Sequence, residues 1–326
     1  MGKRIIRARD MDRHLRFAGT IARWIVPYYS ERKFHFFNAL INTSISKTRP
    51  RGMRKANITV KRPDGSDLPI RIFTPRKEKA KPSPGILWIH GGGYCMGAPE
   101  QDIWTIREFV KANDCTVVAP CYTLATEKPY PAALDDCYQA LLWMRDHAKE
   151  LGIRSDQIFV AGSSAGGGLT AALCIYARDK GEVSIAYQMP LYPMLDDRMI
   201  TRSSQNNDGP IWNTRSNINA WKLYLGNLYQ KDAPVYAAPG RLESFEGLPP
   251  AFTFVGDIEP FYDETVSFME KMKSAGIPAE YKVYHGAYHG FDVLCWFSKP
   301  SRDAHSLMLE NYKWASENLF KAQPEV

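Results

Sequence analysis

A serine between small residues is the first group in the chain whose setting suggests chemistry. Ser164 lies in GSSAG, residues 162–166, between the apolar run IFVA and a segment with helical periodicity. A G-x-S-x-G sequence between a strand and a helix is typical of a nucleophile elbow, in which small neighbours allow a sharp turn that exposes the serine. The start of the helix would also favour developing negative charge. A turn of small residues without chemistry is the simpler alternative, but the flanking strand and helix favour a nucleophile.

A glycine-rich loop, HGGGY at residues 90–94, follows another apolar run, ILWI. It lacks the Lys-Ser/Thr ending of a phosphate-binding loop, and a loop of no chemical consequence is the other alternative. Glycines let backbone N–H groups approach a tetrahedral intermediate, as an oxyanion hole requires. We expect the N–H groups of Gly92 and Gly93, with Ala165 as a third donor, to bind that oxyanion. His90 is expected to brace the loop rather than to take protons.

A base is expected after the last predicted strand, where HGAYHGF supplies two histidines. His285 and His289 compete for the role. We favour His289, because it is placed deeper in the loop and is followed by Gly-Phe. Four other histidines lie in helical or aromatic settings that indicate structural roles: His14, His35, His147 and His305.

The stretch FTFVGDIEPFYDE supplies four carboxylates directly after a predicted strand. Pro260 suits the first position of a helix. Asp263 and Glu264 then fall in its opening turns, where the helix dipole stabilises an anionic side chain by at most about 1 kcal/mol, and we expect both to be solvated. Asp257 and Glu259 are left as candidates for an acid that orients the base. No histidine or further acid stands at ligand spacing, so no metal site is predicted.

Strands alternate with helices along most of the chain, which predicts an α/β fold around a mostly parallel sheet. The predicted strands are two within 57–75, joined by a turn at 63–65, and then 85–90, 115–120, 157–162, 184–193, 251–256 and 279–284. Helices are expected at 133–149, after Ser164, from about Pro260 to the stop signal SAGIP, and at 300–322. The polar, Asn- and Trp-rich residues 198–230 break the alternation and are interpreted as an insertion.

Composition limits the classes of function. No run of about 18 apolar residues is present, which argues against a membrane-spanning helix. The N-terminus lacks the apolar core of a secretory signal, so we expect a cytoplasmic protein.

Six scattered cysteines without a C-x-x-C pair predict free, mostly buried thiols. The net charge of +7 is uneven, because residues 1–55 hold 14 Lys and Arg against three Asp and Glu, a net +11.

HGGGY, GSSAGG and HGF, in this order and on this α/β pattern, resemble the hormone-sensitive-lipase-like branch of the α/β-hydrolases. YPAALDDC at 130–137 and EPFYDE at 259–264 are also similar to that branch, and the resemblance covers about residues 55–325. It implies an α/β-hydrolase fold, a Ser–acid–His triad and a helical cap made by the N-terminus and an insertion after about the sixth strand. The family usually has Asp immediately before the nucleophile, where this chain has Ser163.

The same resemblance bears on the choice of acid. The family's pattern here is Asp-Pro-Leu-x-Asp-Glu, and its first Asp is the triad acid. Alignment of this pattern on Pro260, Asp263 and Glu264 places Glu259 at the position of that acid, which leaves Asp257 to brace the loop. It also implies a division of the chain into a cap part at 1–50, a core at 51–197 and 231–326, and a cap insertion at 198–230. Aromatic residues of the two cap parts are candidate pocket walls, with ordinary packing of the cap as an equal alternative for any one of them: Trp24, Tyr28, Phe34, Phe36, Phe37, Trp212 and Trp221.

The predicted reaction is the hydrolysis of a carboxylic ester. Ser164 would attack the carbonyl, His289 would take its proton and Glu259 would hold the imidazole, without a cofactor. The expected partner is a small-molecule ester with a short to medium acyl chain, such as an acetyl ester. An amidase or formamidase on the same triad, and a ligand-binding protein on a hydrolase scaffold, are the alternatives.

The basic N-terminus raises a third alternative, a binder of nucleic acid or of an acidic membrane. No recognition motif supports it, and a solvated cap helix explains the charge more simply. We therefore expect no nucleic-acid partner and no integral membrane association. The oligomeric state is left open, with a homodimer as one option.

Overall fold

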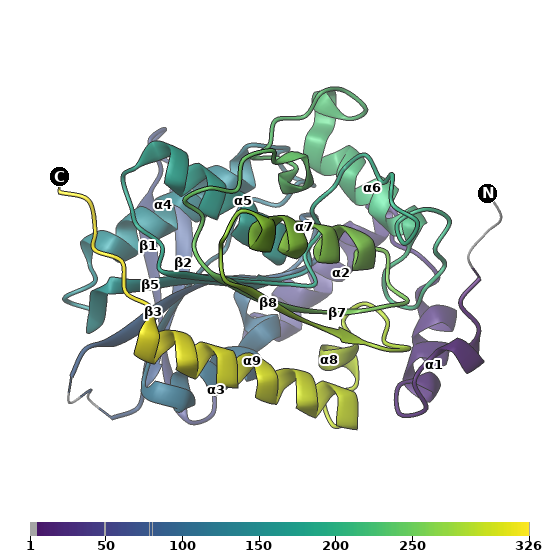
Figure 1. Cartoon of the computed structure of the whole chain (residues 1–326), viewed down its shortest axis with the longest axis horizontal. Helices are drawn as coiled ribbons and strands as arrows, with labels where there is room; N and C mark the ends of the chain where they lie inside the picture. The colour runs from purple at the N-terminus through teal and green to yellow at the C-terminus, as the bar shows by residue number, and fades with distance from the viewer. Residues whose placement is uncertain (1–4, 49, 78, 80, 326) are drawn as a thin grey trace.

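The chain folds around one mixed, mostly parallel sheet, which Figure 1 shows in a computed structural model that describes residues 5–48, 50–77, 79 and 81–325. The strands are β1 (Met53–Lys61), β2 (Asp67–Pro75), β3 (Ser83–Ile89), β4 (Thr116–Pro120), β5 (Ile153–Ser163), β6 (Tyr187–Leu191), β7 (Ala251–Gly256) and β8 (Ala279–Tyr284). Their order in the sheet is β1-β2-β4-β3-β5-β6-β7-β8. β2 pairs antiparallel with β1 and with β4, and the remaining neighbours pair in parallel. The predicted α/β fold is confirmed.

Helices cover both faces of this sheet. In Figure 1, α4 (Ala132–Asp146), α5 (Ala165–Lys180) and α7 (Tyr262–Ser274) lie above it, and α3 (Ile103–Asn113) and α9 (Lys299–Asn318) lie below. Each face has its own hydrophobic cluster. β3, β4, β6 and β7 are buried along their whole length, as expected of strands that are covered on both faces. Because parallel strands end at one edge of the sheet, the loops that follow β3, β5, β7 and β8 meet there.

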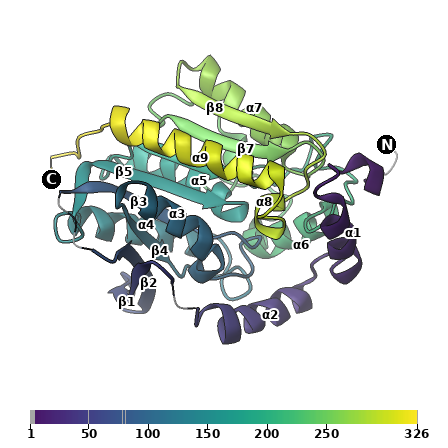
Figure 2. The same ribbon diagram turned by 90° about the horizontal axis from the view of Figure 1, so that it is seen from below.

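Two segments lie outside the strand–helix alternation. The first contains α1 (Arg16–Ile25) and α2 (Glu31–Leu40), and the second follows β6 and contains α6 (Thr214–Leu225). Both are visible beyond the sheet in Figure 2. Hydrogen bonds join them: Tyr29 N to Ser216 Oγ (2.9 Å), Asn213 Nδ2 to the Pro27 carbonyl (2.7 Å) and Asn219 Nδ2 to the Tyr29 carbonyl (2.7 Å). The two segments, which we call the roof, are therefore joined by side-chain-to-backbone hydrogen bonds as well as by the packing of Tyr29 and Phe34 on Trp212.

The remaining elements are short. They are η1 (Ala8–Asp10), the π-helical η2 (Ile41–Ile45), η3 (Pro99–Asp102), η4 (Gly226–Leu228), η5 (Pro239–Arg241) and α8 (Phe291–Leu294). All six cysteines are free and five of them are buried, as predicted. Among the residues that the structure describes, no helix has both the length and the apolar character to cross a membrane.

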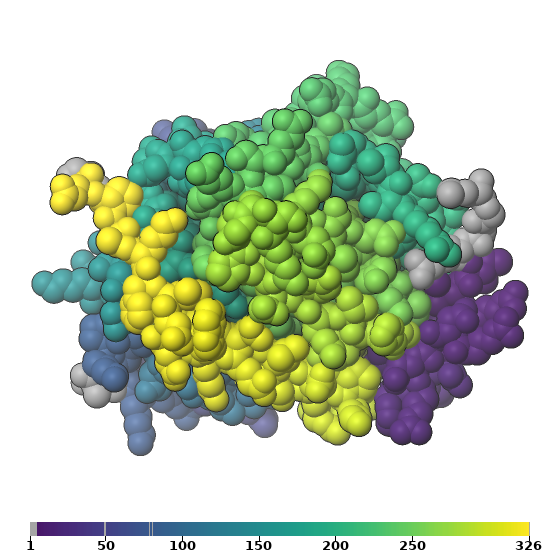
Figure 3. All heavy atoms as spheres, viewed as in Figure 1, coloured from purple at the N-terminus to yellow at the C-terminus, as the bar shows by residue number. Residues whose placement is uncertain are grey.

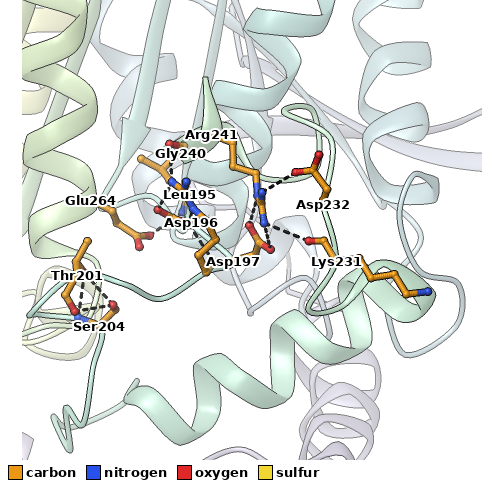
Figure 4. Close-up of polar contacts among 11 residues, drawn as sticks. Leu195, Asp196, Asp197, Thr201, Ser204, Lys231, Asp232, Gly240, Arg241 and Glu264 are labelled. Carbon is orange, nitrogen blue, oxygen red and sulfur yellow. Dashed lines mark hydrogen bonds and ion pairs between the residues drawn. The ribbon is translucent and has the colours of Figure 1, made fainter. Parts of the chain in front are cut away.

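β7 and β8 have the predicted bounds, but the helix after β7 differs from expectation. It begins at Tyr262 rather than at Pro260. The predicted solvation of Glu264 is wrong, because its side chain is buried. Its Oε1 accepts a 2.7 Å hydrogen bond from the Leu195 N–H, toward which the carboxyl points in Figure 4. Burial raises the pKa of Glu264 well above its ordinary value of 4.5, which favours the neutral carboxyl in the fold.

We expect Glu264→Gln to leave the stability nearly unchanged, because glutamine keeps a neutral acceptor of the same shape for Leu195. Glu264→Ala removes that acceptor, and a buried N–H without a partner costs about 1–3 kcal/mol. Urea unfolding of the two variants beside the wild type measures the difference. An equal loss of stability in both would mean that the charged carboxylate is needed.

Candidate active site

Ser164 stands alone between β5 and α5, in a backbone conformation that few side chains adopt. Its φ is 58° and its ψ is −119°, in a region that is strained for any residue but glycine. Three backbone hydrogen bonds hold it: its N–H donates to the Leu191 carbonyl (2.9 Å), and its carbonyl accepts from Gly168 N (2.9 Å) and Met194 N (3.0 Å). The sharp turn predicted from GSSAG is therefore present.

The glycines on either side of this turn are required by close packing. A Cβ at Gly166 would lie 2.0 Å from the Ile89 carbonyl oxygen, and a Cβ at Gly162 would lie 2.5 Å from the same atom. Real Cβ atoms do not approach that closely. The turn can therefore sit against the end of β3 only with glycine at both positions, which explains the spacing of the motif.

His289 lies between Ser164 and Glu259. Its Nε2 is 2.7 Å from Ser164 Oγ, and its Nδ1 is hydrogen-bonded to Glu259 Oε2. The rings of Tyr192 and Phe261 meet the imidazole edge-on, with centroids 5.2 and 5.0 Å away. The ring is thus held by one carboxylate and two aromatic walls, and its free nitrogen is directed at the serine hydroxyl.

The two carboxylates that the sequence left in competition have different partners. Glu259 is fully buried, and its second oxygen accepts the Gly256 N–H at 3.0 Å. Asp257 instead contacts His285 Nδ1 (2.9 Å) and the Gly286 N–H (2.7 Å). It therefore ties the loop after β7 to the loop after β8, as a brace would.

The glycine loop after β3 lies against the serine. A Cβ at Gly91 would be 3.3 Å from Ser164 Cβ, and both Gly92 and Gly93 have positive φ. Ala165 is the first residue of α5, where N–H groups lack partners within the helix. His90 is buried, with Nδ1 2.8 Å from the Gly91 carbonyl. Burial lowers the pKa of His90 to about 4, so it is neutral at pH 7 and braces the loop.

A cavity of about 470 Å³ opens beside these groups. Ser164, His289 and all three loop glycines line it together with apolar side chains of α1 and α8. Among the described residues, no group of three His, Cys, Asp or Glu side chains is arranged to hold a metal ion.

Only one of the aromatic residues predicted as walls, Trp212, lines this cavity, and Tyr29 joins it in place of Tyr28. Trp24 and Phe36 are exposed, and Trp221 is buried in the core against Tyr94 and Tyr224. Tyr28, Phe34 and Phe37 do not line the cavity either. The prediction is thus wrong for six of the seven residues, because aromatic character alone does not say which way a side chain points.

Two residues of the cavity had no local signal in the sequence. Asp102 lines it while its Oδ2 accepts a 2.9 Å hydrogen bond from Trp88 Nε1. Tyr192 also lines it and donates its hydroxyl to Asp292 at 3.2 Å. Burial raises the pKa of Asp102 to about 7, and the nearby charge of Asp292 adds to the rise.

Comparisons with known proteins agree with this geometry. Residues 86–293 match the family described as alpha/beta hydrolase fold. Esterase LipI of Mycobacterium tuberculosis is 34% identical over 233 residues, which are 70% of this chain and 72% of LipI. Acetyl esterase of Salmonella typhi is 26% identical over 233 residues, 69% of each chain. The solved structure of bacterial heroin esterase superposes on this chain with a TM-score of 0.86 at 32% sequence identity. The match covers 94% of this chain and 98% of the heroin esterase chain.

The chain therefore belongs to the α/β-hydrolase fold family, in its hormone-sensitive-lipase-like carboxylesterase branch. Within that branch it is a carboxylic ester hydrolase.

We expect the stability of the Asp102→Asn variant to increase relative to that of the wild type as the pH rises. Between its ordinary pKa of 3.8 and about 7, Asp102 is protonated in the folded chain but ionised in the unfolded chain, so wild-type stability falls with rising pH across this window. Asparagine does not titrate and can still accept from Trp88. The gap in Tm between variant and wild type should therefore widen from about pH 4 to about pH 7 and then level off.

Glu317→Gln, at an exposed position of α9, serves as the control, and its Tm should follow that of the wild type. A gap between Asp102→Asn and the wild type that is the same at every pH would contradict the assignment.

Proposed function

We propose that this carboxylesterase hydrolyses esters of short to medium acyl chains, acetyl esters among them, with Ser164 as the nucleophile. The observation that carries the proposal is the line of contacts from Ser164 Oγ through the imidazole of His289 to the Glu259 carboxylate. A hydroxyl is a weak nucleophile unless a base accepts its proton. The 2.7 Å between Ser164 Oγ and His289 Nε2 is within the reach that this transfer requires.

In the first half of the reaction, Ser164 Oγ forms a bond to the carbonyl carbon of the ester while its proton passes to His289 Nε2. The carbonyl π electrons move to the oxygen, which accepts hydrogen bonds from the N–H groups of Gly92, Gly93 and Ala165. One such donor is worth roughly 3–4 kcal/mol of transition-state stabilisation. The carboxylate of Glu259 stabilises the imidazolium that forms. The bond to the alcohol oxygen then breaks, and His289 protonates the departing alcohol.

In the second half, water takes the place of the alcohol. The water oxygen attacks the acyl-serine carbonyl while His289 accepts a proton from the water. The same N–H groups bind the second oxyanion. Collapse of this intermediate returns the proton to Ser164 Oγ and releases the carboxylic acid. Atoms and charges balance without a cofactor, because the base is neutral again after each half-reaction.

The size of the substrate follows from the cavity and its roof. A volume of about 470 Å³, walled by Trp212, Tyr29 and Ile41, suits an acyl chain of short to medium length. We assign the roof, residues 1–50 and 198–230, as the cap of this enzyme. Its two parts are hydrogen-bonded to one another, which supports this assignment. The likeness to an acetyl esterase supports small acyl groups.

Replacement of Ser164 by alanine tests the nucleophile. With a series of p-nitrophenyl esters from acetate to decanoate, we expect kcat/KM to be highest for the shorter chains. In Ser164→Ala it should fall by a factor on the order of 10⁴ or more for all of them. Ser163→Ala, which removes the neighbouring hydroxyl of the same cavity, is the matched control and should keep most of the activity. Full activity in Ser164→Ala would exclude the mechanism.

The acid is tested by Glu259→Gln against Asp257→Asn. Loss of the Glu259 charge leaves the imidazolium without its counter-ion, and we expect kcat to fall by a factor on the order of 10³ to 10⁴. Asp257→Asn perturbs the contacts with His285 and Gly286, neither of which reaches Ser164 or His289, and should cost about tenfold or less. A larger fall in kcat for Asp257→Asn would reverse the assignment.

A further inference from the structure

The helix α1 turns its apolar side chains outward. Phe17, Ile21, Trp24 and Ile25 recur at helical spacing on one side of it, and all four are exposed, Phe17 by 78% and Trp24 by 84%. Its buried residue, Gly19, faces the core on the other side. An amphipathic surface helix normally turns its apolar stripe toward the core. Within the described part of the chain, this stripe is therefore left uncovered.

A second exposed apolar group lies at the same opening. Val293 and Leu294 of α8 line the catalytic cavity, as does Ile25 of α1, and Trp296 and Phe297 follow them. All are exposed, Trp296 by 69%. We call the combined set the mouth collar: Phe17, Ile21, Trp24, Ile25, Val293, Leu294, Trp296 and Phe297. Three of its members, Ile25, Val293 and Leu294, line the cavity that holds Ser164, and Phe17 and Trp24 lie outside that lining.

The mouth collar has a fixed position on the molecule. The Asp12 N–H donates to the Gly286 carbonyl at 2.9 Å, and the Tyr288 hydroxyl donates to the Leu15 carbonyl at 3.2 Å. These contacts hold α1 beside the loop that carries His289. Figure 3 shows the purple N-terminal segment directly beside the yellow-green chain of this region. The part of the collar on α1 thus has a fixed position beside that loop.

Positive charge accompanies the mouth collar. Residues 1–55 contain 14 Lys and Arg against three Asp and Glu. Arg7, Arg9, Arg13 and Arg16, which lead into α1 or begin it, are exposed. Arg23, on the inward side, is instead used by Asp208 in an ion pair of 3.4 Å. The exposed surface next to the collar is therefore basic.

We propose that the mouth collar docks on an anionic lipid surface. Interfacial helices bind by burying an apolar face among the headgroups while basic residues attract anionic lipids, and tryptophan is favoured at that depth. A second copy of this chain is the weaker occupant. A twofold contact through the collar would set two segments of net charge +11 against each other, because both partners use the same patch in such a contact.

Docking would place the opening of the cavity against the lipid. Esters that partition into a bilayer could then enter the cavity without crossing water. This consequence rests on the proposed ester hydrolysis, whereas the docking itself does not, so the two can fail separately.

The test is flotation of the full chain with lipid vesicles. Vesicles of phosphatidylcholine with phosphatidylglycerol are compared with vesicles of phosphatidylcholine alone, at low and at high salt. We expect binding to the anionic vesicles only, weakened by salt. Phe17→Ser/Trp24→Ser should reduce this binding about tenfold or more, whereas Trp104→Ser, at an exposed tryptophan of α3, should not. Arg13→Glu should weaken it more than Lys313→Glu at an exposed position of α9.

Hydrolysis of a soluble p-nitrophenyl ester is the control for folding, and the double variant should retain it within about twofold. Binding by Ser164→Ala equal to that of the wild type would show that docking is independent of catalysis. The proposal is overturned if the wild type does not float with anionic vesicles, or if the double variant floats equally well. It is also overturned if sedimentation shows a dimer that Phe17→Ser/Trp24→Ser dissociates, because the occupant is then a second copy.

Discussion

The positive φ of Ser164 is the constraint on which the site depends. A non-glycine residue in a sparsely populated backbone region costs on the order of 1–3 kcal/mol and persists only where its surroundings determine it. Here the surroundings are the end of β6, which accepts the Ser164 N–H through Leu191, and the chain after it, where Met194 donates to the Ser164 carbonyl. The strained turn is therefore stable only if β5 and β6 pair in the register that brings Leu191 to Ser164 and α5 begins directly after it.

The other groups of the site follow from the same edge of the sheet. Glu259 comes from the loop after β7 and His289 from the loop after β8, so parallel pairing of these strands sets how far apart the two side chains can be. Asp257 joins the two loops through His285 and Gly286. The imidazole is therefore positioned by the sheet and by a second carboxylate that does not touch it.

The sequence predicted what depends on neighbouring residues. The turn at Ser164 and the bounds of β7 and β8 follow from motifs that are each contained in a few residues. The preference for Glu259 over Asp257 comes instead from the resemblance to a family, because the residues of that loop alone leave both open. Glu264 was mispredicted because its hydrogen-bond partner, Leu195, lies 69 positions away, and burial by a distant segment outweighs a preference for the start of a helix. Asp102 and Tyr192 were missed for a similar reason, since nothing near them in the sequence indicates that they line the cavity.

The hydrogen bonds that join the two parts of the roof have a consequence for how such enzymes diverge. The roof walls the cavity with Tyr29, Ile41 and Trp212, yet Ser164, Glu259 and His289 all lie in loops at the sheet edge. Substitutions or insertions in the roof can therefore reshape the cavity while Ser164, Glu259 and His289 keep their positions. The shape of the cavity and the placement of these three side chains are thus set by different parts of the chain, so that one can change without the other.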